Sequence, residues 1–396
     1  MSQKIVLGYS GGLDTTVMIK WLSEKYDAKI VTVTVDVGQR EDLNEIEERA
    51  YHAGAQKHVS FDCKKEFYED YVKKAIKANA LYQGEYPLST ALARPLIAKK
   101  LVQVAREEGA DAVAHGCTGK GNDQIRFEVS IKALDPKLRV YAPVRDWGLT
   151  RDAEIEYAKK KGLNINPKSK VYSVDQNLWG RSIEGGVLED LSQAVPKDAL
   201  EWVVPLEETP DEPAFVTVKF KQGVPVALND LTDGVQIVRF LNTLAGKHGF
   251  GLVDHVEDRV VGIKSREVYE VPAALALIKA HRELEKLTLN THQLRLKPFL
   301  EAEWARLVYS GLWFDPLREN LDAFIESTQK AVEGEVELKL FKGSCSVVSR
   351  KSPNSLYKLS LATYSSESSF DQSLAKGFTE IWGLPTILST LKVDGA

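Results

Sequence analysis

The strongest constraint on the fold of this chain is its opening segment, which reads IVLGYSGGLDTT over residues 5–16. An apolar run ends at the glycine pair Gly11-Gly12, and a stretch with helical periodicity follows. Adjacent glycines let a backbone approach an anion closely and adopt positive φ. The first turn of a helix adds unpaired N–H groups and the positive end of a dipole. This strand–turn–helix unit therefore predicts a phosphate-binding loop.

The residues around the glycine pair indicate which kind of phosphate site this is. The chain has no GxxxxGK[ST] segment and so no P-loop lysine, and no GxGxxG segment typical of dinucleotide-binding folds. Ser10, Asp14 and Thr15 instead complete an SGGxD[ST] pattern. This pattern resembles the loop of the ATP pyrophosphatases, which holds the pyrophosphate that leaves when a substrate attacks the α-phosphorus. Gly-Gly alone usually marks only a turn, so the prediction rests on the positions of Ser10, Asp14 and Thr15 relative to the two glycines.

Composition excludes several classes of protein. A chain of 396 residues is longer than one core usually covers, which favours two domains and an appendage. The net charge of −4, with both signs interspersed, does not suggest a nucleic-acid binder. Cys63, Cys117 and Cys345 form neither a disulfide framework nor a CxxC site, and no histidines have metal-ligand spacing. With no signal peptide and no membrane-length apolar run, we expect a cytoplasmic protein that binds neither nucleic acid nor membranes.

Strands and helices alternate over the first part of the chain. The patterns predict strands over 4–9, 28–37, 57–62, 110–116 and 139–144, and helices over 15–25, 41–53, 64–80, 91–108 and 151–161. Such alternation is typical of a parallel sheet covered by helices on both faces. We therefore expect an α/β, doubly wound nucleotide-binding domain over residues 1–166.

The pattern changes to α+β in a predicted second domain over residues 167–364. Residues 168–200 are expected to be loop-like. Further on, the sequence predicts a hairpin over 215–228, a helix over 235–247, a strand-rich stretch over 253–271, helices over 273–288, 296–311 and 317–332, and strands over 335–348 and 356–362.

A tail over residues 365–396 completes the predicted organisation. It carries one apolar stripe at helical spacing, formed by Phe370, Leu374, Phe378, Ile381 and Trp382. The apolar face of such a helix needs a partner, most simply another subunit. The alternative is that the tail packs on its own domain.

A second polar motif, GCTGKGNDQIRF, occupies residues 116–127 after the predicted fourth strand. In a doubly wound sheet this strand pairs with the first on the side opposite strands two and three, so its loop lies beside the Ser10–Asp14 loop. Arg126 can grip a carboxylate with two hydrogen bonds, and Asp123 can accept from an amino group. The alternative is a polar loop capped by its Asn and Asp side chains.

With these two motifs, the chain resembles the argininosuccinate synthetase family over nearly its whole length. Residues 116–127 fit that family's second signature throughout, and the first signature departs only at Gly8, where Ala or Ser is usual. The resemblance implies condensation of citrulline with aspartate through a citrullyl-adenylate, with ATP converted to AMP and pyrophosphate. It also implies a nucleotide-binding domain, a synthetase domain and a C-terminal oligomerisation helix, assembled as a homotetramer. Mg²⁺ should accompany the ATP.

The resemblance also implies roles for individual residues. The ATP contacts would be Gly8, Tyr9, Ser10, Gly11, Gly12, Leu13, Asp14, Thr15, Thr16, Val35 and Gly116. Citrulline would be held by Tyr86, Asn122, Arg126, Ser173, Ser182, Glu257 and Tyr269, and aspartate by Thr118, Asn122 and Asp123. The residues expected to act in catalysis are Asp123, Arg126 and Asp14.

Asp14 and two positions outside these sets have open alternatives. Asp14 is expected in the outer shell of the magnesium ion, or else as a helix-capping residue. Ala91 stands where some relatives place a serine in the citrulline site, which puts one hydrogen bond in question. Cys117 is interpreted as a small filler rather than a nucleophile.

The chemistry of the implied reaction agrees with this set of residues. A ureido carbon is a poor electrophile, and transfer of AMP to its oxygen creates a leaving group that an amine can displace. Positioning and charge stabilisation carry most of such a reaction. An ammonia-using or tRNA-modifying ATP pyrophosphatase should add a glutaminase domain, cysteine pairs or a basic face, and the sequence shows none. If the chain were a non-catalytic nucleotide-binding protein, the second motif would have no function.

Overall fold

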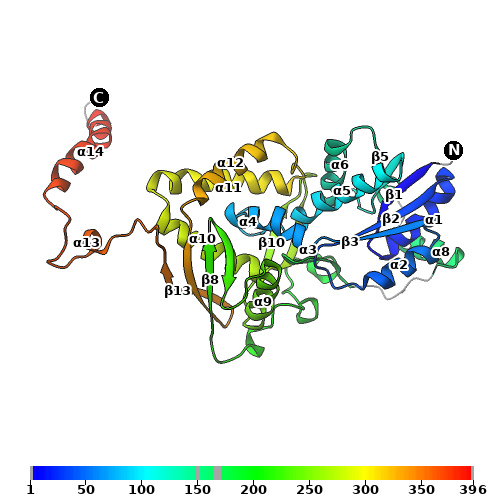
Figure 1. Ribbon diagram of the computed structural model, residues 1–396, viewed down its shortest axis with the longest axis horizontal. Helices are drawn as coiled ribbons and strands as arrows, with labels where there is room; N and C mark the ends of the chain where they lie inside the picture. The colour runs from blue at the N-terminus through cyan, green and yellow to red at the C-terminus, as the bar shows by residue number, and fades with distance from the viewer. Residues whose placement is uncertain (1–2, 148–150, 164–170, 394–396) are drawn as a thin grey trace. The chain divides into compact units, whose positions relative to one another are not determined.

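The computed structural model describes residues 3–147, 151–163 and 171–393 (Figure 1). The chain divides into two compact units, Met1–Asn354 and Ser355–Ala396. The domain boundary predicted at residues 166 and 167 lies outside the described residues.

The first unit begins with the predicted parallel sheet. Its strands are β1 (Lys4–Gly8), β2 (Lys29–Asp36), β3 (Lys57–Asp62), β4 (Ala112–Ala114) and β5 (Arg139–Tyr141). They pair in parallel in the order β3-β2-β1-β4-β5. The prediction that the fourth strand pairs with the first is thereby confirmed. The predicted strand over 139–144 is too long, because Pro143 begins a helix.

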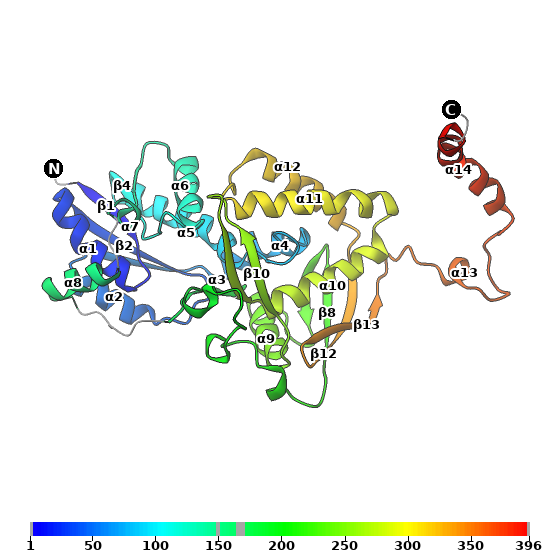
Figure 2. The same ribbon diagram turned by 180° about the vertical axis from the view of Figure 1, so that it is seen from behind.

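Helices cover both faces of this sheet (Figures 1 and 2). They are α1 (Leu13–Tyr26), α2 (Leu43–His52), α5 (Ser89–Glu107), α6 (Asp123–Leu134), α7 (Pro143–Trp147) and α8 (Arg151–Lys160). Successive β1 residues point to opposite faces. Ile5 and Leu7 therefore pack in the core under α1 and α2, whereas Val6 packs in the core that contains α5. Burial on both faces explains why this strand is apolar without alternation.

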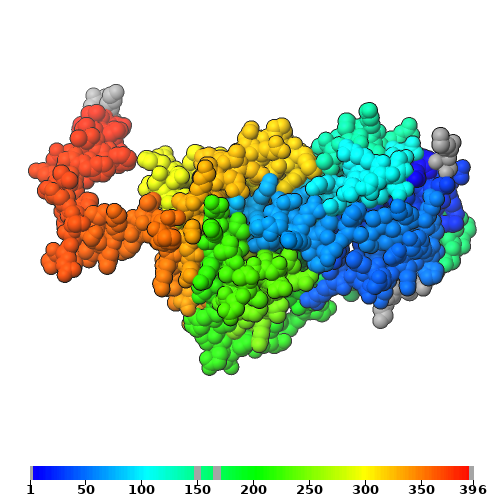
Figure 3. Space-filling model, in the orientation of Figure 1, coloured from blue at the N-terminus to red at the C-terminus, as the bar shows by residue number. Residues whose placement is uncertain are grey.

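The predicted helix over 64–80 is interrupted. It consists of α3 (Lys64–Phe67), a π-helical segment η1 (Tyr68–Val72) and α4 (Lys73–Lys77). Figure 3 shows this blue segment packed against the yellow and orange helices from later in the chain. Ion pairs from Lys74 to Asp322 (2.8 Å) and from Lys77 to Glu326 (2.7 Å) fix that contact.

Two antiparallel sheets follow in the first unit. One has the order β10-β11-β7-β6 and the other the order β13-β12-β8-β9. Their strands are β6 (Ser173–Gln176), β7 (Arg181–Glu184), β8 (Ala214–Lys221), β9 (Val224–Leu228), β10 (Leu252–Asp258), β11 (Lys264–Glu270), β12 (Gly334–Phe341) and β13 (Ser344–Lys351). The expected hairpin over 215–228 is confirmed by β8 and β9.

Two predictions in this region are wrong. Residues 168–200, expected to be loop-like, contain β6 and β7, which are short and polar and exist as strands because β7 pairs with β11. The stretch 335–348, expected to be one strand, is part of the hairpin β12–β13. Its turn at Lys342-Gly343 has positive φ at both residues (44° and 76°), the geometry of a tight hairpin turn.

The remaining helices of the first unit agree with the predicted positions. They are α9 (Gly234–Lys247), α10 (Pro272–Thr288), α11 (Thr291–Tyr309) and α12 (Pro316–Gln329), with short 3₁₀ turns η2 (Gly186–Glu189), η3 (Lys197–Ala199) and η4 (Leu206–Glu208). Helix α11 begins five residues earlier than its apolar pattern suggests, because Asn290 and Gln293 form a reciprocal capping box.

The second unit contains α13 (Leu359–Ala362) and α14 (Leu374–Val393). The strand predicted over 356–362 is wrong: the segment ends in one helical turn, and the described part of this unit offers no strand to pair with it. Phe370 precedes α14, whereas Phe378, Ile381 and Trp382 lie on it and are 60%, 72% and 75% exposed. No helix in the described ranges has the length and apolar character needed to cross a membrane.

Candidate active site

The glycine turn after β1 forms an open cradle at the start of α1. Gly11 has φ +74°, a conformation that favours glycine. Gly12 is the N-cap of α1, and no side chain from the described residues caps the helix there. A Cβ built on Gly12 would meet only the Ser10 Oγ, at 3.3 Å. The free N–H groups of the first turn and the nearby hydroxyls are a donor set that fits the phosphates of a nucleotide.

Several residues predicted to contact ATP lie in the buried core next to this loop. The Tyr9 hydroxyl lies 3.0 Å from the Thr16 Oγ1 in the core, and burial raises the pKa of Tyr9. Val35 is buried in β2. A Cβ on Gly8 would come within 3.3 Å of Leu101, which gives a packing reason for glycine where Ala or Ser is usual. Any contact of Tyr9, Thr16 or Val35 with a ligand would thus depend mainly on their main chain.

Two charged residues near the cradle, Asp14 and Arg49, differ in their partners. Asp14 lies half-buried in the first turn of α1, and no hydrogen bond or ion pair of its carboxylate is found among the described residues. The capping alternative therefore has no hydrogen bond to support it. Arg49 of α2, which sequence reasoning missed, donates from Nη1 to the Gly11 carbonyl at 3.1 Å.

The second motif lies beside the first, as predicted. A Cβ on Gly116 would meet the Thr15 Cγ2 at 3.0 Å, so the loops after β1 and β4 are in contact. The Gln124 amide shapes the second loop by donating to the carbonyls of Gly119 (2.6 Å) and Gly121 (3.3 Å), and Thr118 is exposed on it.

Cys117 lies in the same loop, and burial raises its pKa to about 12. A thiol with that pKa is almost entirely protonated at neutral pH and is a weak nucleophile. This agrees with its interpretation as a filler.

Asp123 begins α6 between two guanidinium groups. Its Oδ1 accepts from the Arg126 Nη1 at 2.7 Å, and its Oδ2 accepts from the Arg94 Nε at 2.9 Å. Burial alone would raise the pKa of Asp123, but the charges of Arg94 and Arg126 outweigh burial and lower the pKa to about 2. Asp123 is therefore an anion at neutral pH. It is well suited to orient an ammonium group, but its low pKa makes it a weak acceptor for a proton from that group.

Arg126 is held on several sides and is only 4% exposed. Its Nε donates to the Tyr309 carbonyl at 2.9 Å, and its guanidinium lies 5.0 Å from the centre of the Tyr309 ring. No acceptor for its Nη2 is found in the described part of the chain. The N–H groups of that nitrogen remain for a ligand carboxylate.

The residues predicted to hold citrulline come together from distant segments. Tyr86 stacks on Tyr269 with 3.9 Å between ring centres, and the Tyr269 hydroxyl donates to the Glu257 Oε2 at 2.6 Å. Ser182 pairs with Tyr269 across β7 and β11. Ser173 is exposed at the start of β6, and no contact with this cluster is found for it among the described residues.

Sequence reasoning missed three residues that connect these groups. Arg94 of α5 pairs with Asp123 of α6 and with Asp175 of β6. Arg259 donates to Glu184, to Glu267 (2.6 Å) and to the Lys120 carbonyl (3.2 Å). Arg94 could have been found as the single charged residue among residues 89–98 of α5, one turn after Thr90. Arg259 and Tyr309 have no comparable local signal.

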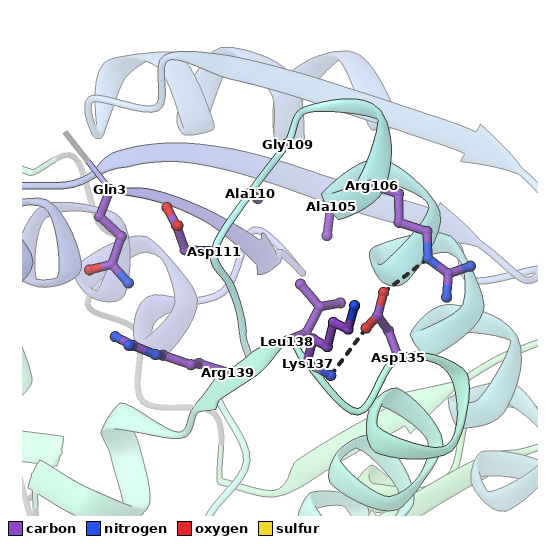
Figure 4. Close-up of a pocket in the computed structure, with 10 residues that line it drawn as sticks. All are labelled: Gln3, Ala105, Arg106, Gly109, Ala110, Asp111, Asp135, Lys137, Leu138 and Arg139. Carbon is purple, nitrogen blue, oxygen red and sulfur yellow. Dashed lines mark hydrogen bonds and ion pairs between the residues drawn. The ribbon is translucent and has the colours of Figure 1, made fainter. Parts of the chain in front are cut away.

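A separate cavity of about 600 Å³ lies at the amino ends of the strands of the parallel sheet (Figure 4). Gln3, Asp111 and Arg139 line it at the beginnings of β1, β4 and β5, and Arg106 pairs with Asp135 at 3.1 Å beside it. Ligands of parallel α/β sheets bind at the carboxyl ends of the strands. The cavity is therefore not the candidate active site.

Comparison with known proteins supports one family over both parts of the chain. Residues 4–164 match the family model described as the Arginosuccinate synthase N-terminal HUP domain, and residues 172–389 match the Arginosuccinate synthase C-terminal domain.

Three curated relatives named argininosuccinate synthase extend this agreement. The relative from Pyrococcus furiosus is 57% identical over 393 residues, which cover 99% of this chain and 95% of the relative. The relative from Methanopyrus kandleri is 56% identical over 385 residues, covering 96% and 97%. The relative from Pyrobaculum aerophilum is 53% identical over 388 residues, covering 98% of each chain. The chain therefore belongs to the argininosuccinate synthase family of carbon–nitrogen ligases.

Proposed function

We propose that this chain condenses citrulline with aspartate to form argininosuccinate in arginine biosynthesis, and that ATP is converted to AMP and pyrophosphate. Membership of the family supports this activity. The observation that carries it here is the contact between the open glycine cradle and the loop that leads to Asn122, Asp123 and Arg126. A nucleotide and two amino acids could meet at that contact.

The nucleotide half of the reaction is assigned to the first loop. The contacts to ATP would come from Gly8, Tyr9, Ser10, Gly11, Gly12, Leu13, Asp14, Thr15, Thr16, Val35 and Gly116. ATP supplies the adenylyl group that makes the ureido oxygen of citrulline a leaving group, through a citrullyl-adenylate. Asp14 has a carboxylate without a protein partner among the described residues, which suits the outer shell of a magnesium ion bound to the phosphates.

The amino-acid half is assigned to the charged cluster around Asp123, Arg126 and Glu257. Citrulline would be held by Tyr86, Asn122, Arg126, Ser173, Ser182, Glu257 and Tyr269, and aspartate by Thr118, Asn122 and Asp123. The low pKa of Asp123 supports an orienting role toward the amino group of aspartate rather than a proton-accepting one. The chain would then act mainly by positioning and charge stabilisation.

Product analysis tests the proposed reaction. With ATP, citrulline and aspartate present, AMP and pyrophosphate should be released in equal amounts together with argininosuccinate. Omitting either amino acid should stop argininosuccinate formation. Release of ADP and phosphate instead would contradict the assignment.

We further propose that the chain works in the cytoplasm as a homotetramer, with a nucleotide-binding domain over 1–166, a synthetase domain over 167–364 and an oligomerisation tail over 365–396. The free cysteines suit a reducing compartment. The exposed apolar side chains of α14 support an interface role for the tail. Deleting residues 366–396 should lower the mass measured by light scattering, and a truncated chain that stays tetrameric would remove the tail from the interface.

A further inference from the structure

Tyr309 ends α11 inside the candidate active site and is only 1% exposed. Its hydroxyl donates to the Glu257 Oε1 at 2.5 Å and accepts from the Asn122 Nδ2 at 2.8 Å. Burial, followed by the nearby Glu257 charge, raises the pKa of Tyr309, so the phenol keeps its proton. One hydroxyl thus connects two residues assigned to amino-acid binding.

The bond to Glu257 determines how Asn122 is oriented. The single proton of the Tyr309 hydroxyl is directed to the carboxylate, so the hydroxyl can only accept from Asn122. At the other end of the amide, the Val260 N–H donates to the Asn122 Oδ1 at 2.9 Å. A reversed amide would place its carbonyl against the Tyr309 oxygen and its NH₂ against the Val260 N–H. With this orientation, one amide N–H of Asn122 has no acceptor in the described part of the chain and can donate to a substrate carboxylate.

The rest of Tyr309 contacts Arg126 through different atoms. The main-chain carbonyl accepts from the Arg126 Nε, and the ring lies under the guanidinium. Tyr82 stacks on the ring with 3.5 Å between centres. Replacing tyrosine by phenylalanine would keep these contacts and remove only the hydroxyl. The hydroxyl's role can therefore be separated from packing.

We propose that Tyr309 is a positioning residue whose hydroxyl orients the Asn122 amide as a donor to substrate carboxylates and holds the Glu257 carboxylate in place. This inference rests on the proposed function, since it deepens the assignment of Asn122 and Glu257 to amino-acid binding. Tyr309 itself needs no contact with the reacting atoms.

The test is the KM of each substrate in Tyr309→Phe. Losing hydrogen bonds to a charged group and to a binding amide should raise the KM for citrulline and for aspartate by about 10- to 100-fold, with the KM for ATP changed by less than about threefold. Tyr68→Phe is the matched control, because its buried hydroxyl has one hydrogen bond among the described residues, to the Pro225 carbonyl at 3.3 Å. This control should keep all three KM values. If Tyr309→Phe behaves like the control, the proposal is overturned.

A double-mutant cycle separates action through Asn122 from a general disturbance. Asn122→Ala should raise the KM for aspartate, and adding Tyr309→Phe should then change that KM little, because the amide to be oriented is gone. Fully additive losses would overturn the positioning role. A wild-type protein that forms no argininosuccinate would instead contradict the proposed function, so the two failures are distinguishable.

Discussion

The two halves of the candidate site are built in opposite ways. The proposed nucleotide cradle comes from one contiguous segment, residues 8–16, and most of its side-chain hydrogen bonds join residues within that segment. The proposed amino-acid cluster draws side chains from residues as far apart as Tyr86 and Tyr309, and most of these side chains already have a protein partner. One half depends on open backbone and the other on a preformed charge network.

This difference has an energetic consequence. Because little packs against Gly12, a change there should affect binding more than folding. Asp123 and Arg126 are each other's partners, so a change at either one removes a buried ion pair as well as a ligand contact. Binding and stability should therefore be separable in the cradle and coupled in the cluster.

The largest effect is expected from Gly12→Val. Gly12 has φ −77°, which valine can adopt, but the branched side chain would occupy the place of the phosphates. Turnover of ATP should fall by at least about 100-fold, while the unfolding temperature stays close to that of the wild type.

An assay of ATP turnover and thermal unfolding check both parts of this prediction, and calorimetric titration with ATP shows whether binding is lost. Gly11→Val provides the contrast: with φ +74° and Ile46 at 3.0 Å from a built Cβ, it should destabilise the fold as well. Unchanged ATP affinity in Gly12→Val would contradict the cradle.

The same contrast explains what could be predicted from the sequence. Ser10, Gly12 and Thr15 are neighbours in the chain, so their pattern revealed the loop, and alternation of strands and helices revealed the sheet beneath it. Asn122, Asp123 and Arg126 were likewise visible as one motif. Tyr309 was not, because its importance arises only when α11 meets α6, and no periodicity encodes that contact. Strands β6 and β7 were missed for the same reason, since they depend on pairing with β11.

Arg126→Lys should weaken citrulline binding. A lysine ammonium cannot donate to the Tyr309 carbonyl, to Asp123 and to a ligand carboxylate with the planar geometry of a guanidinium. We expect kcat/KM for citrulline to fall by roughly 30-fold or more. Citrulline-dependent isotope exchange between bridge and non-bridge oxygens of ATP should be suppressed in parallel, and undiminished exchange at low citrulline would argue against this role.

Asp123→Asn should affect the second half-reaction instead. The amide keeps the shape of the carboxylate but loses the charge that attracts an ammonium group. Argininosuccinate formation should fall by roughly 10-fold or more, while citrulline-dependent isotope exchange survives. If Asp123→Asn and Arg126→Lys lose exchange equally at saturating citrulline, the division of labour between the two residues is wrong.

The smallest effect concerns acid stability, where the cluster and the cradle should differ again. The folded pKa of Asp123, about 2, lies below its ordinary value of 3.8 because of Arg94 and Arg126. The stability that this carboxylate contributes, roughly 2 kcal/mol, is therefore fully present above about pH 4 and is lost as the pH falls through about 2. Asp123→Asn should be less stable at pH 7 and should lose less of its remaining stability between pH 4 and pH 2.

Asp14→Asn is the matched control from the cradle, because it removes no recorded ion pair or hydrogen bond among the described residues. Its free energy of unfolding at pH 7 should stay within about 0.5 kcal/mol of the wild type. Urea unfolding of the three proteins at pH 7, pH 4 and pH 2 checks these expectations. If the wild type and Asp123→Asn lose stability equally on acidification, the two arginines do not stabilise this carboxylate. The contrast between a cluster of paired charges and an open cradle would then rest on geometry alone.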